Sequence, residues 1–393
     1  MVKQKGVFSS FIIRLSIVAT ALSVMVMIVS VAIITGFSHN IKDQLYSFWG
    51  HVTISVRDEN FSLQKPIQKD PELEQHVKNI PHVQTIQPFI EGTAIIHAHN
   101  AMQGIILKGV DAHFHHPGSI HIKGKIDFSD SAYSKQIIIS QTNADKLELS
   151  TGDTVQLYFI EKGVTTPRIR KVMISGVFET GSDDIDGKFG ICDMRLLQRI
   201  NSWEPNEIHG YQVMLDDPKY ADTVSNEIFY NYIKTPLNSY TLREKAGGMF
   251  SWLDTVQVNN TIILIIMAIV AIINLTAALM ILIVDHAKMV GLLKALGLAD
   301  IKMREVFLYY ASLIAGIGIT VGNVLGLGLC YIQYKTGFVP LGEGYNMKTV
   351  PIRLYWWQIV AIDGGTLVIC ILFMWLPTLY IRRIQPAKVL QFK

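Results

Sequence analysis

The residues with the most evident capacity for chemistry are histidines that crowd into one stretch of the chain. Six of the twelve histidines lie between His97 and His121, in the segments HAHN and DAHFHHPGSIH. Two histidines separated by one residue on a β-strand lie on the same face, and such pairs can bind zinc or copper. However, no cysteine and few carboxylates accompany them, and Pro117-Gly118 favours a loop. Two interpretations stay open, a metal-binding sensor and a solvated loop, and we assign no metal ligand.

An acidic segment, GSDDIDGK, begins like a calcium-binding loop with Asp183, Asp184 and Asp186. Such a loop needs a bidentate glutamate at its twelfth position. Counting twelve residues from Asp183 or Asp184 reaches a methionine or an arginine instead. The segment is therefore predicted to be an acidic turn between strands.

The sequence also lacks the motifs of nucleotide and peptide hydrolysis. The segment nearest to a phosphate-binding loop runs from Gly118 to Lys125. It has one residue too many and is followed by Ile126, where serine or threonine must ligate magnesium. No HExxH or GxSxG motif is present. We therefore expect no catalytic residue and no cofactor in this chain.

The chain contains four long apolar stretches, and these determine on which side of a membrane the segments described above can lie. They are residues 15–34, 262–284, 307–332 and 356–380. Each is long enough to cross a hydrocarbon core of about 30 Å, which takes about 20 residues. A segment of ordinary soluble composition separates the first two. The predicted fold is therefore an α-helical membrane protein with four transmembrane helices and a large α+β domain inserted between helices 1 and 2.

The predicted domain boundaries follow these stretches. Residues 1–37 would hold the N-terminus and the first transmembrane helix, 38–258 the large domain with helical stalks, and 259–393 the other three helices with a basic tail. The first apolar run is longer than the roughly 7–15 residues of a signal peptide core, so we expect an anchor that is not cleaved.

Lysines and arginines in the short loops favour one orientation. Eleven lie in the two terminal segments and the loop after the second span, against three in the loop after the third span. Because positively charged loops stay in the cytoplasm, both termini are predicted to be cytoplasmic and the large domain to lie on the other side. The net charge of +3 gives no reason to expect nucleic acid as a partner.

Within the large domain, patterns of period two and of helical period alternate. Phe37, Ile41, Leu45 and Phe48 continue the helix of the first span as a stalk that would turn into a strand at Gly50. Strands are predicted for TAIIHA, GIILKGV, QIIISQ, DTVQLYF, RKVMISGVF and YQVMLD, and helices for ELEQHVKNI and DMRLLQRI. Only Cys192 lies in this domain, which excludes a disulfide within it.

Small and polar residues in the spans carry two further predictions. Gly318, Gly322 and Gly326 repeat every four residues, which lets helix backbones approach closely, either within one chain or between two copies. Asp363 is an intramembrane carboxylate and hence a functional candidate. The alternative for Asp363 is a bond to Asn323 or Asn274 within the bundle.

Between the second and third spans, the segment MVGLLKALGLADIKMREVFLYY begins as a short basic amphipathic helix. Met289, Leu292, Leu293 and Leu296 form its apolar stripe. One interpretation, left open by the residues, is an interfacial helix that lies on lipid.

Three segments of the membrane part resemble a known family. They are FSSFIIRLSIVATALSVMVMIVSVAIITGF, GLLKALGLADIKMREVFLYYASLIAGIGITVGNVLGLGL and RRIQPAKVLQF. They are similar to the permeases of the macrolide-exporter and FtsX-like type of ABC transporter, and among these to the lipoprotein-releasing permeases. The large domain matches more loosely, through KLELSTGDTVQLYF and ISGVFETGSDDIDGKFGICDMRLLQRI.

This resemblance implies that the short amphipathic helix is a coupling helix. It would dock into a groove of a separate cytoplasmic ATPase, which would bind the ATP and magnesium. Lys294 would meet acidic groups at the rim, Gly297 would end the helix, and Asp300 would cap the third span. The residues of this predicted site are Met289, Leu292, Leu293, Lys294, Leu296 and Gly297. Many family members carry an acidic residue at the position of Met289.

The resemblance also implies a mechanical transporter in the inner membrane of a diderm bacterium. Two permease copies, homologous or identical, would lift a lipoprotein from the outer leaflet onto a soluble periplasmic carrier, and the large domain would be periplasmic. Candidates for contact with the acyl chains are Val24, Met25, Ile28, Ile265 and Met267, for which bundle packing or contact with membrane lipid is the alternative. A rival function is an FtsX-like regulator of a periplasmic cell-wall hydrolase, and a second rival is the metal-binding sensor.

Overall fold

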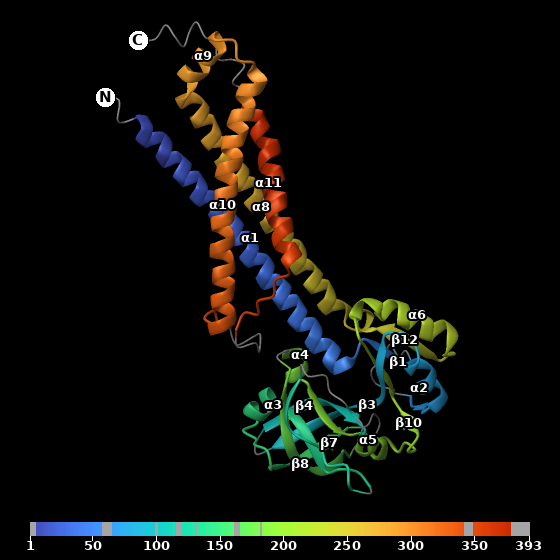
Figure 1. Ribbon diagram of the computed structural model, residues 1–393. Coiled ribbons are helices and arrows are strands. Elements are labelled where there is room, and N and C mark those ends of the chain that lie inside the picture. The colour runs from blue at the N-terminus through green and yellow to red at the C-terminus, as the bar shows by residue number, and fades with distance from the viewer. Residues whose placement is uncertain are drawn as a thin grey trace. The chain divides into compact units, whose positions relative to one another are not determined.

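The computed structural model shows two compact units (Figure 1). It describes residues 5–56, 65–98, 101–112, 114, 120–130, 132–160, 166–180, 183–341 and 349–378. Unit 1 comprises Met1–His39, Trp252–Pro340 and Thr349–Lys393, and unit 2 comprises Asn40–Ser251 and Leu341–Lys348.

Unit 1 is built from helices. They are α1 (Lys5–Trp49), whose C-terminal part belongs to unit 2, α8 (Gly247–Asp285), whose start up to Ser251 belongs to unit 2, α9 (Ala287–Ala295), α10 (Asp300–Thr336) and α11 (Trp356–Thr378). Candidate membrane spans cover Ile13–Trp49, Gly247–Asp285, Asp300–Thr336 and Trp356–Trp375. The described part of the chain therefore confirms the prediction of four helices that can cross a membrane.

Aromatic side chains mark both ends of α10. Tyr309 and Tyr310 near its start and Tyr331 and Tyr334 near its end are all at least 56% exposed. Tyr310 and Tyr331 are 21 positions apart, which corresponds to about 30 Å along a helix and matches the thickness of a hydrocarbon core. Because tyrosines gather at membrane–water interfaces, this spacing fits a helix that crosses a bilayer.

Unit 2 is built around a ten-stranded mixed sheet. Its order is β12-β1-β11-β3-β4-β9-β6-β8-β5, with β7 paired to β3 and β8. The strands are β1 (Val52–Val56), β3 (Val83–Ala98), β4 (Ala101–Val110), β5 (His121–Gly124), β6 (Gln136–Ser140), β7 (Thr154–Phe159), β8 (Arg168–Glu179), β9 (Phe189–Asp193), β11 (Gly210–Leu215) and β12 (Leu237–Thr241). A separate pair joins β2 (Ile67–Gln68) and β10 (Glu207–Ile208). All six predicted strands are present, which confirms the α+β composition.

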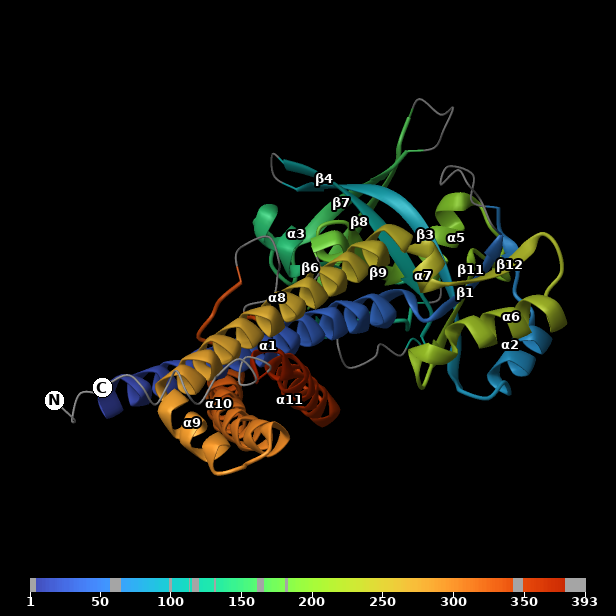
Figure 2. The same ribbon diagram turned by 90° about the horizontal axis from the view of Figure 1, so that it is seen from above.

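Short helices surround this sheet. They are α2 (Pro71–Lys78), α3 (Gln141–Lys146), α4 (Asp183–Asp186), α5 (Met194–Asn201), α6 (Ala221–Asn231) and α7 (Leu242–Lys245), with a 3-10 turn, η1 (Pro218–Tyr220). Helix α6 lies beside β12 and β1 (Figure 2), and α2 packs against β3. Helices α2 and α5 confirm the two predicted helical runs. The acidic segment forms the helical turn α4, in which the buried Asp186 carboxylate accepts from the backbone N–H and the hydroxyl of Thr180.

The central strands of unit 2 are buried on both faces. In β6, which lies between β9 and β8, Ile137, Ile138 and Ile139 are at most 4% exposed. A continuous apolar run is typical of a strand covered on both sides. The core of unit 2 is therefore closed, and its single cysteine, Cys192, is free and completely buried.

The predicted helical continuation of the first span is present at the end of α1. The helix continues without interruption to Trp49 and ends at Gly50, whose φ of 77° lies in the left-handed region that favours glycine. Strand β1 begins two residues later, at Val52.

Candidate functional site

The predicted coupling helix is present as α9, between α8 and α10 (Figure 1). The side chains of its apolar stripe lie in two different environments. Met289, Leu292 and Leu296 are 46%, 51% and 76% exposed, whereas Leu293 packs against the helix cluster of unit 1. Val290 is buried beside Leu293. One part of the stripe therefore anchors α9 in the bundle, and the other part is an unburied apolar surface.

The end of α9 follows the Schellman pattern. The backbone N–H of Gly297 donates to Lys294 O, and the N–H of Leu298 donates to Leu293 O. Gly297 has a φ of 91°, a conformation that a side chain would disfavour. The geometry of this loop therefore sets the angle at which α9 leads into α10.

The prediction that Asp300 caps α10 is wrong. The N-cap residue is Ala299, which forms no side-chain cap, and Asp300 is the first residue of the helix. Its carboxylate instead lies 2.9 Å from the ammonium of Lys294. A carboxylate in the first turn is still favourable to the helix dipole, and the ion pair connects α9 to α10 directly. Lys294 therefore has an acidic partner within its own chain.

The glycine ladder of α10 lies against α1 of the same chain. Gly318, Gly322 and Gly326 lie against Thr20, Ala21, Val24 and Ile28. A Cβ on Gly322 would lie 2.7 Å from the carbonyl oxygen of Ala21 and 2.8 Å from the Cβ of Val24. Only a residue without a side chain permits this approach. The ladder has the first of the two predicted arrangements, packing within one chain.

The candidates for acyl contact differ in accessibility. Val24 and Ile28 are completely buried beneath α10. Ile265 on α8 is 55% exposed, and Met25 and Met267 are partly exposed. Of these five candidates, Met25, Ile265 and Met267 are thus accessible at the surface of unit 1, whereas Val24 and Ile28 are not.

Asp363 is hydrogen-bonded inside the bundle. The Nδ2 atom of Asn323 donates to Asp363 Oδ2 over 2.7 Å, so the predicted bond to Asn323 is present. Among the described residues, the Oδ1 atoms of both side chains are buried without a hydrogen-bond partner. The pair joins α10 to α11 and retains two acceptor oxygens for an incoming donor.

The histidine-rich stretch is only partly within the described residues. His97 lies on β3 and contacts Tyr158 edge to face, and His121 lies on β5. The other four histidines, His99, His113, His115 and His116, lie outside the described residues. The described residues contain no group of three side chains suited to a metal ion.

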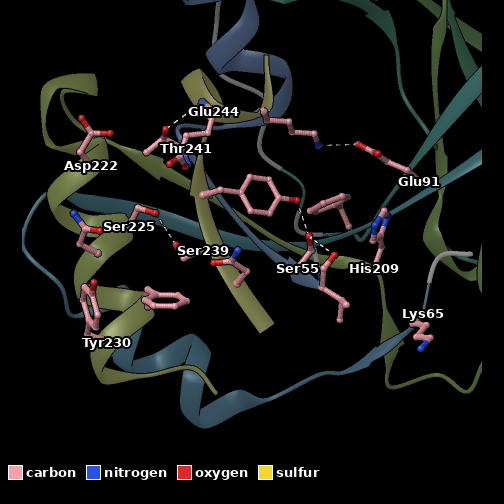
Figure 3. Close-up of a pocket in the computed structure, with 17 residues that line it drawn as sticks. Ser55, Lys65, Glu91, His209, Asp222, Ser225, Tyr230, Ser239, Thr241 and Glu244 are labelled. Carbon is pink, nitrogen blue, oxygen red and sulfur yellow. Dashed lines mark hydrogen bonds and ion pairs between the residues drawn. The ribbon is translucent and has the colours of Figure 1, made fainter. Parts of the chain in front are cut away.

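An open cavity of about 760 Å³ lies in unit 2 between α6, β12, β1 and β3 (Figure 3). Ser225 and Ser239 pair their hydroxyls over 2.9 Å, and Ser55 pairs with the phenol of Tyr240 over 2.6 Å. On the opposite side lie Glu91 and His209 (Figure 3). Val56, Phe89 and Phe229 also line the cavity, so it offers both hydrogen bonds and apolar surface.

Glu91 and Lys108 are two buried residues of opposite charge in unit 2, and sequence reasoning missed both. Burial lowers the pKa of the Lys108 ammonium to about 7, although the charge of Glu91 counteracts this effect. Burial alone would raise the pKa of Glu91, but the charges of Lys245, His209 and Lys108 together hold it below its ordinary value. The lysine in GIILKGV offered one signal, because it interrupts an otherwise apolar strand.

Two family models match this chain. The model described as the MacB-like periplasmic core domain matches residues 15–228, and the FtsX-like permease C-terminal model matches residues 261–386. The chain belongs to the family of proteins with a MacB-like periplasmic core domain.

Curated relatives match over nearly the full length. A protein of Xylella fastidiosa (strain 9a5c) named lipoprotein-releasing system transmembrane protein LolC is 25% identical over 100% of this chain and 96% of its own. The protein of the same system named LolE in Haemophilus influenzae is 21% identical over 99% of this chain and 96% of its own. The solved periplasmic region of MacB from Actinobacillus actinomycetemcomitans aligns with 50% of this chain and 91% of its own, at 12% identity and a TM-score of 0.35.

Proposed function

We propose that this chain is the permease subunit of an ATP-driven ABC transporter that extracts lipoproteins from the outer leaflet of an inner membrane and passes them to a periplasmic carrier. The observation that carries this proposal is the full-length similarity to relatives named as transmembrane proteins of a lipoprotein-releasing system. Similarity over both the membrane part and the large domain favours lipoprotein release over regulation of a cell-wall hydrolase.

The proposed arrangement inserts unit 2 between the first and second transmembrane helices, on the periplasmic side, with both termini in the cytoplasm. Support comes from the chain order, since residues 40–251 of unit 2 fall between the spans in α1 and α8. The excess of lysine and arginine at the termini and around α9 supports the orientation.

In this arrangement, α9 is the contact to a separate cytoplasmic ATPase. The exposed side chains of Met289, Leu292 and Leu296 would enter an apolar groove of that ATPase. Lys294 would act indirectly, because its ion pair with Asp300 holds α9 against α10. The permease itself would contribute no catalytic residue and no cofactor, and a second permease copy would complete the transporter.

The lipoprotein would enter beside α1 and α8. Ser30 on α1 and Asn260 on α8 are hydrogen-bonded over 2.8 Å, so these helices are neighbours within unit 1. The accessible side chains of Met25, Ile265 and Met267 would then contact the acyl chains. Val24 and Ile28 are buried against α10 and would make no such contact.

The contact to the ATPase is tested by the substitutions Leu292→Asp and Leu296→Asp. Both positions are exposed, so the fold of unit 1 is preserved, while a carboxylate in an apolar groove is strongly unfavourable. We expect co-purification of the ATPase with the permease to fall at least tenfold. The matched control is Phe338→Asp, which alters a residue that is 71% exposed at the other end of α10. Unchanged co-purification of both variants would refute α9 as the docking helix.

A further inference from the structure

The β3–β4 hairpin of unit 2 carries two opposite charges at facing positions. Glu91 on β3 and Lys108 on β4 are direct register partners. They are 9% and 2% exposed, and charged residues are rarely buried to this extent unless they are paired. The contacts of each charge show what holds it in the interior.

Lys108 fastens the end of helix α1 to β4. Its ammonium donates hydrogen bonds to the carbonyl oxygen of Phe48 and to the side-chain oxygen of Gln212, and it lies 4.8 Å from the centre of the Phe48 ring. Phe48 belongs to the last turn of α1, whose carbonyl groups have no partner within the helix. A cation at this end also complements the helix dipole. The last turn of α1 is therefore bound to the sheet by a charged group.

Glu91 on β3 binds the chain segment that leads into the second long helix, α8. Its carboxylate lies 3.6 Å from the ammonium of Lys245, the last residue of α7 (Figure 3). Helix α8 begins two residues later, at Gly247. The capping box of Thr241 and Glu244 holds the start of α7 in place. The chain segment that leads into α8 is thus attached to the strand next to the one that holds α1.

Each attachment involves a buried charge: the Lys108 ammonium is buried together with its acceptors, and the Glu91 carboxylate is buried although its partner Lys245 is exposed. A surface ion pair can open at little cost, whereas opening a buried one leaves an unpaired charge in the interior. A displacement of α1 or of the α7–α8 segment within unit 2 must therefore either move the β3–β4 hairpin or leave a buried charge without its partner.

We propose that Glu91, Lys108 and Lys245 form a joint that passes movement of the stalk helices α1 and α8 to the β3–β4 hairpin of unit 2. This inference rests on the proposed function for its physiological role, since an ATP-driven permease has such movement to transmit. The joint itself is a property of unit 2 and is testable without transport.

The central variant is Lys108→Met in the full-length permease, reconstituted with its ATPase. Methionine fills a similar volume, but it leaves the Phe48 carbonyl without its donor and Glu91 without the cation that faces it, so the variant should be less stable. We expect a lower thermal unfolding temperature and, at a temperature where the variant is still folded, an at least tenfold loss of ATP-dependent transfer of a fluorescent lipoprotein. A purely structural role for Lys108 predicts the lower unfolding temperature together with normal transfer by the folded variant. The matched control, Lys171→Met, removes an exposed lysine of β8 and should alter neither quantity.

A second measurement follows the joint directly. Spin labels at Lys42→Cys on α1 and Thr93→Cys on β3 report the distance between the stalk and the hairpin within unit 2. We expect a narrow distance distribution in the parent chain and a clearly broader one with Lys108→Met. A narrow distribution in both, or normal transfer by Lys108→Met, overturns the joint. If the parent complex transfers no lipoprotein but the distance distribution is still narrow in the parent and broader with Lys108→Met, the joint stands and the proposed function fails.

Discussion

The two units place the same kinds of side chains in opposite ways. In unit 2, apolar residues such as Ile137 and Leu157 are completely buried, and so is the charged Lys108. In unit 1, Ile265 of α8 and Leu372 of α11 are 55% and 65% exposed. This contrast shows that unit 2 is closed against water, whereas the outer surface of unit 1 is suited to contact with hydrocarbon.

The contrast extends to the forces that hold each unit together. Without water to expel, helices in a bilayer gain little from covering apolar side chains and depend on close contact. The fit of the α10 glycines against α1 supplies that contact in unit 1. Unit 2 relies on its apolar core and can therefore tolerate costly buried charges. Changes that alter charge should affect unit 2 most, and changes that alter shape should affect unit 1 most.

The largest effect is expected for the buried ammonium of Lys108. Its pKa is lowered from 10.5 to about 7 in the folded state, so the unfolded chain binds more protons between these pH values. Stability therefore rises with pH across that window, by up to about 5 kcal/mol relative to a chain without this group. Chemical denaturation of the parent chain and of Lys108→Met from pH 7 to pH 10.5 measures the difference. If the free energy of unfolding changed with pH equally in the two chains, the ammonium of Lys108 would not be held in an unfavourable environment.

A smaller effect of the same sign, in a more acidic pH window, is expected for His51, at the junction of α1 and β1. Its Nδ1 atom accepts from the backbone N–H of Leu215 over 3.0 Å, and burial lowers its pKa from 6.5 to about 4. Because the unfolded chain takes up the proton first, stability falls as pH drops from 6.5 to 4, by up to about 3 kcal/mol. His51→Asn keeps an acceptor but does not titrate. It should lose less stability on acidification than the parent chain, and an equal loss would contradict the prediction.

The smallest effect is expected in unit 1, for a substitution that adds side-chain volume without changing charge. Gly322→Ala places a methyl group 2.7 Å from the carbonyl oxygen of Ala21, and this overpacking should cost about 1 to 3 kcal/mol. Gly328→Ala is the matched control on the same helix, because no atom lies within 4 Å of its added carbon. Thermal unfolding in detergent compares the two. Equal unfolding temperatures would mean that the contact between α1 and α10 does not stabilise unit 1.

Features set by local pattern were predictable from the sequence. The apolar run QIIISQ predicted a strand, and the structure buries β6 on both faces. The helical period from Phe37 to Phe48 predicted a stalk that ends at Gly50. In each case, neighbouring residues alone determine the outcome.

Features set by distant partners were not predictable. Lys108 resembles a solvent-facing strand residue until the register places Glu91 opposite and the end of α1 within reach. Asp300 looked like a cap in the sequence, but it is the first residue of α10, and its carboxylate pairs with Lys294 of the preceding helix. The sequence showed the apolar stripe of α9, whereas the different environments of the partly buried Leu293 and the exposed Leu292 depend on how α9 packs against the other helices.

The burial of Cys192 has a consequence for the folding of the newly made chain. Burial raises the pKa of this thiol, and a thiol that stays protonated is a poor nucleophile. In an oxidising compartment such as the periplasm, a lone exposed cysteine would cross-link one molecule to another. The closed sheet protects it, so the hazard is confined to the interval between export and completion of the core. Slow folding of unit 2 would therefore appear first as disulfide-linked dimers, before any loss of the folded protein.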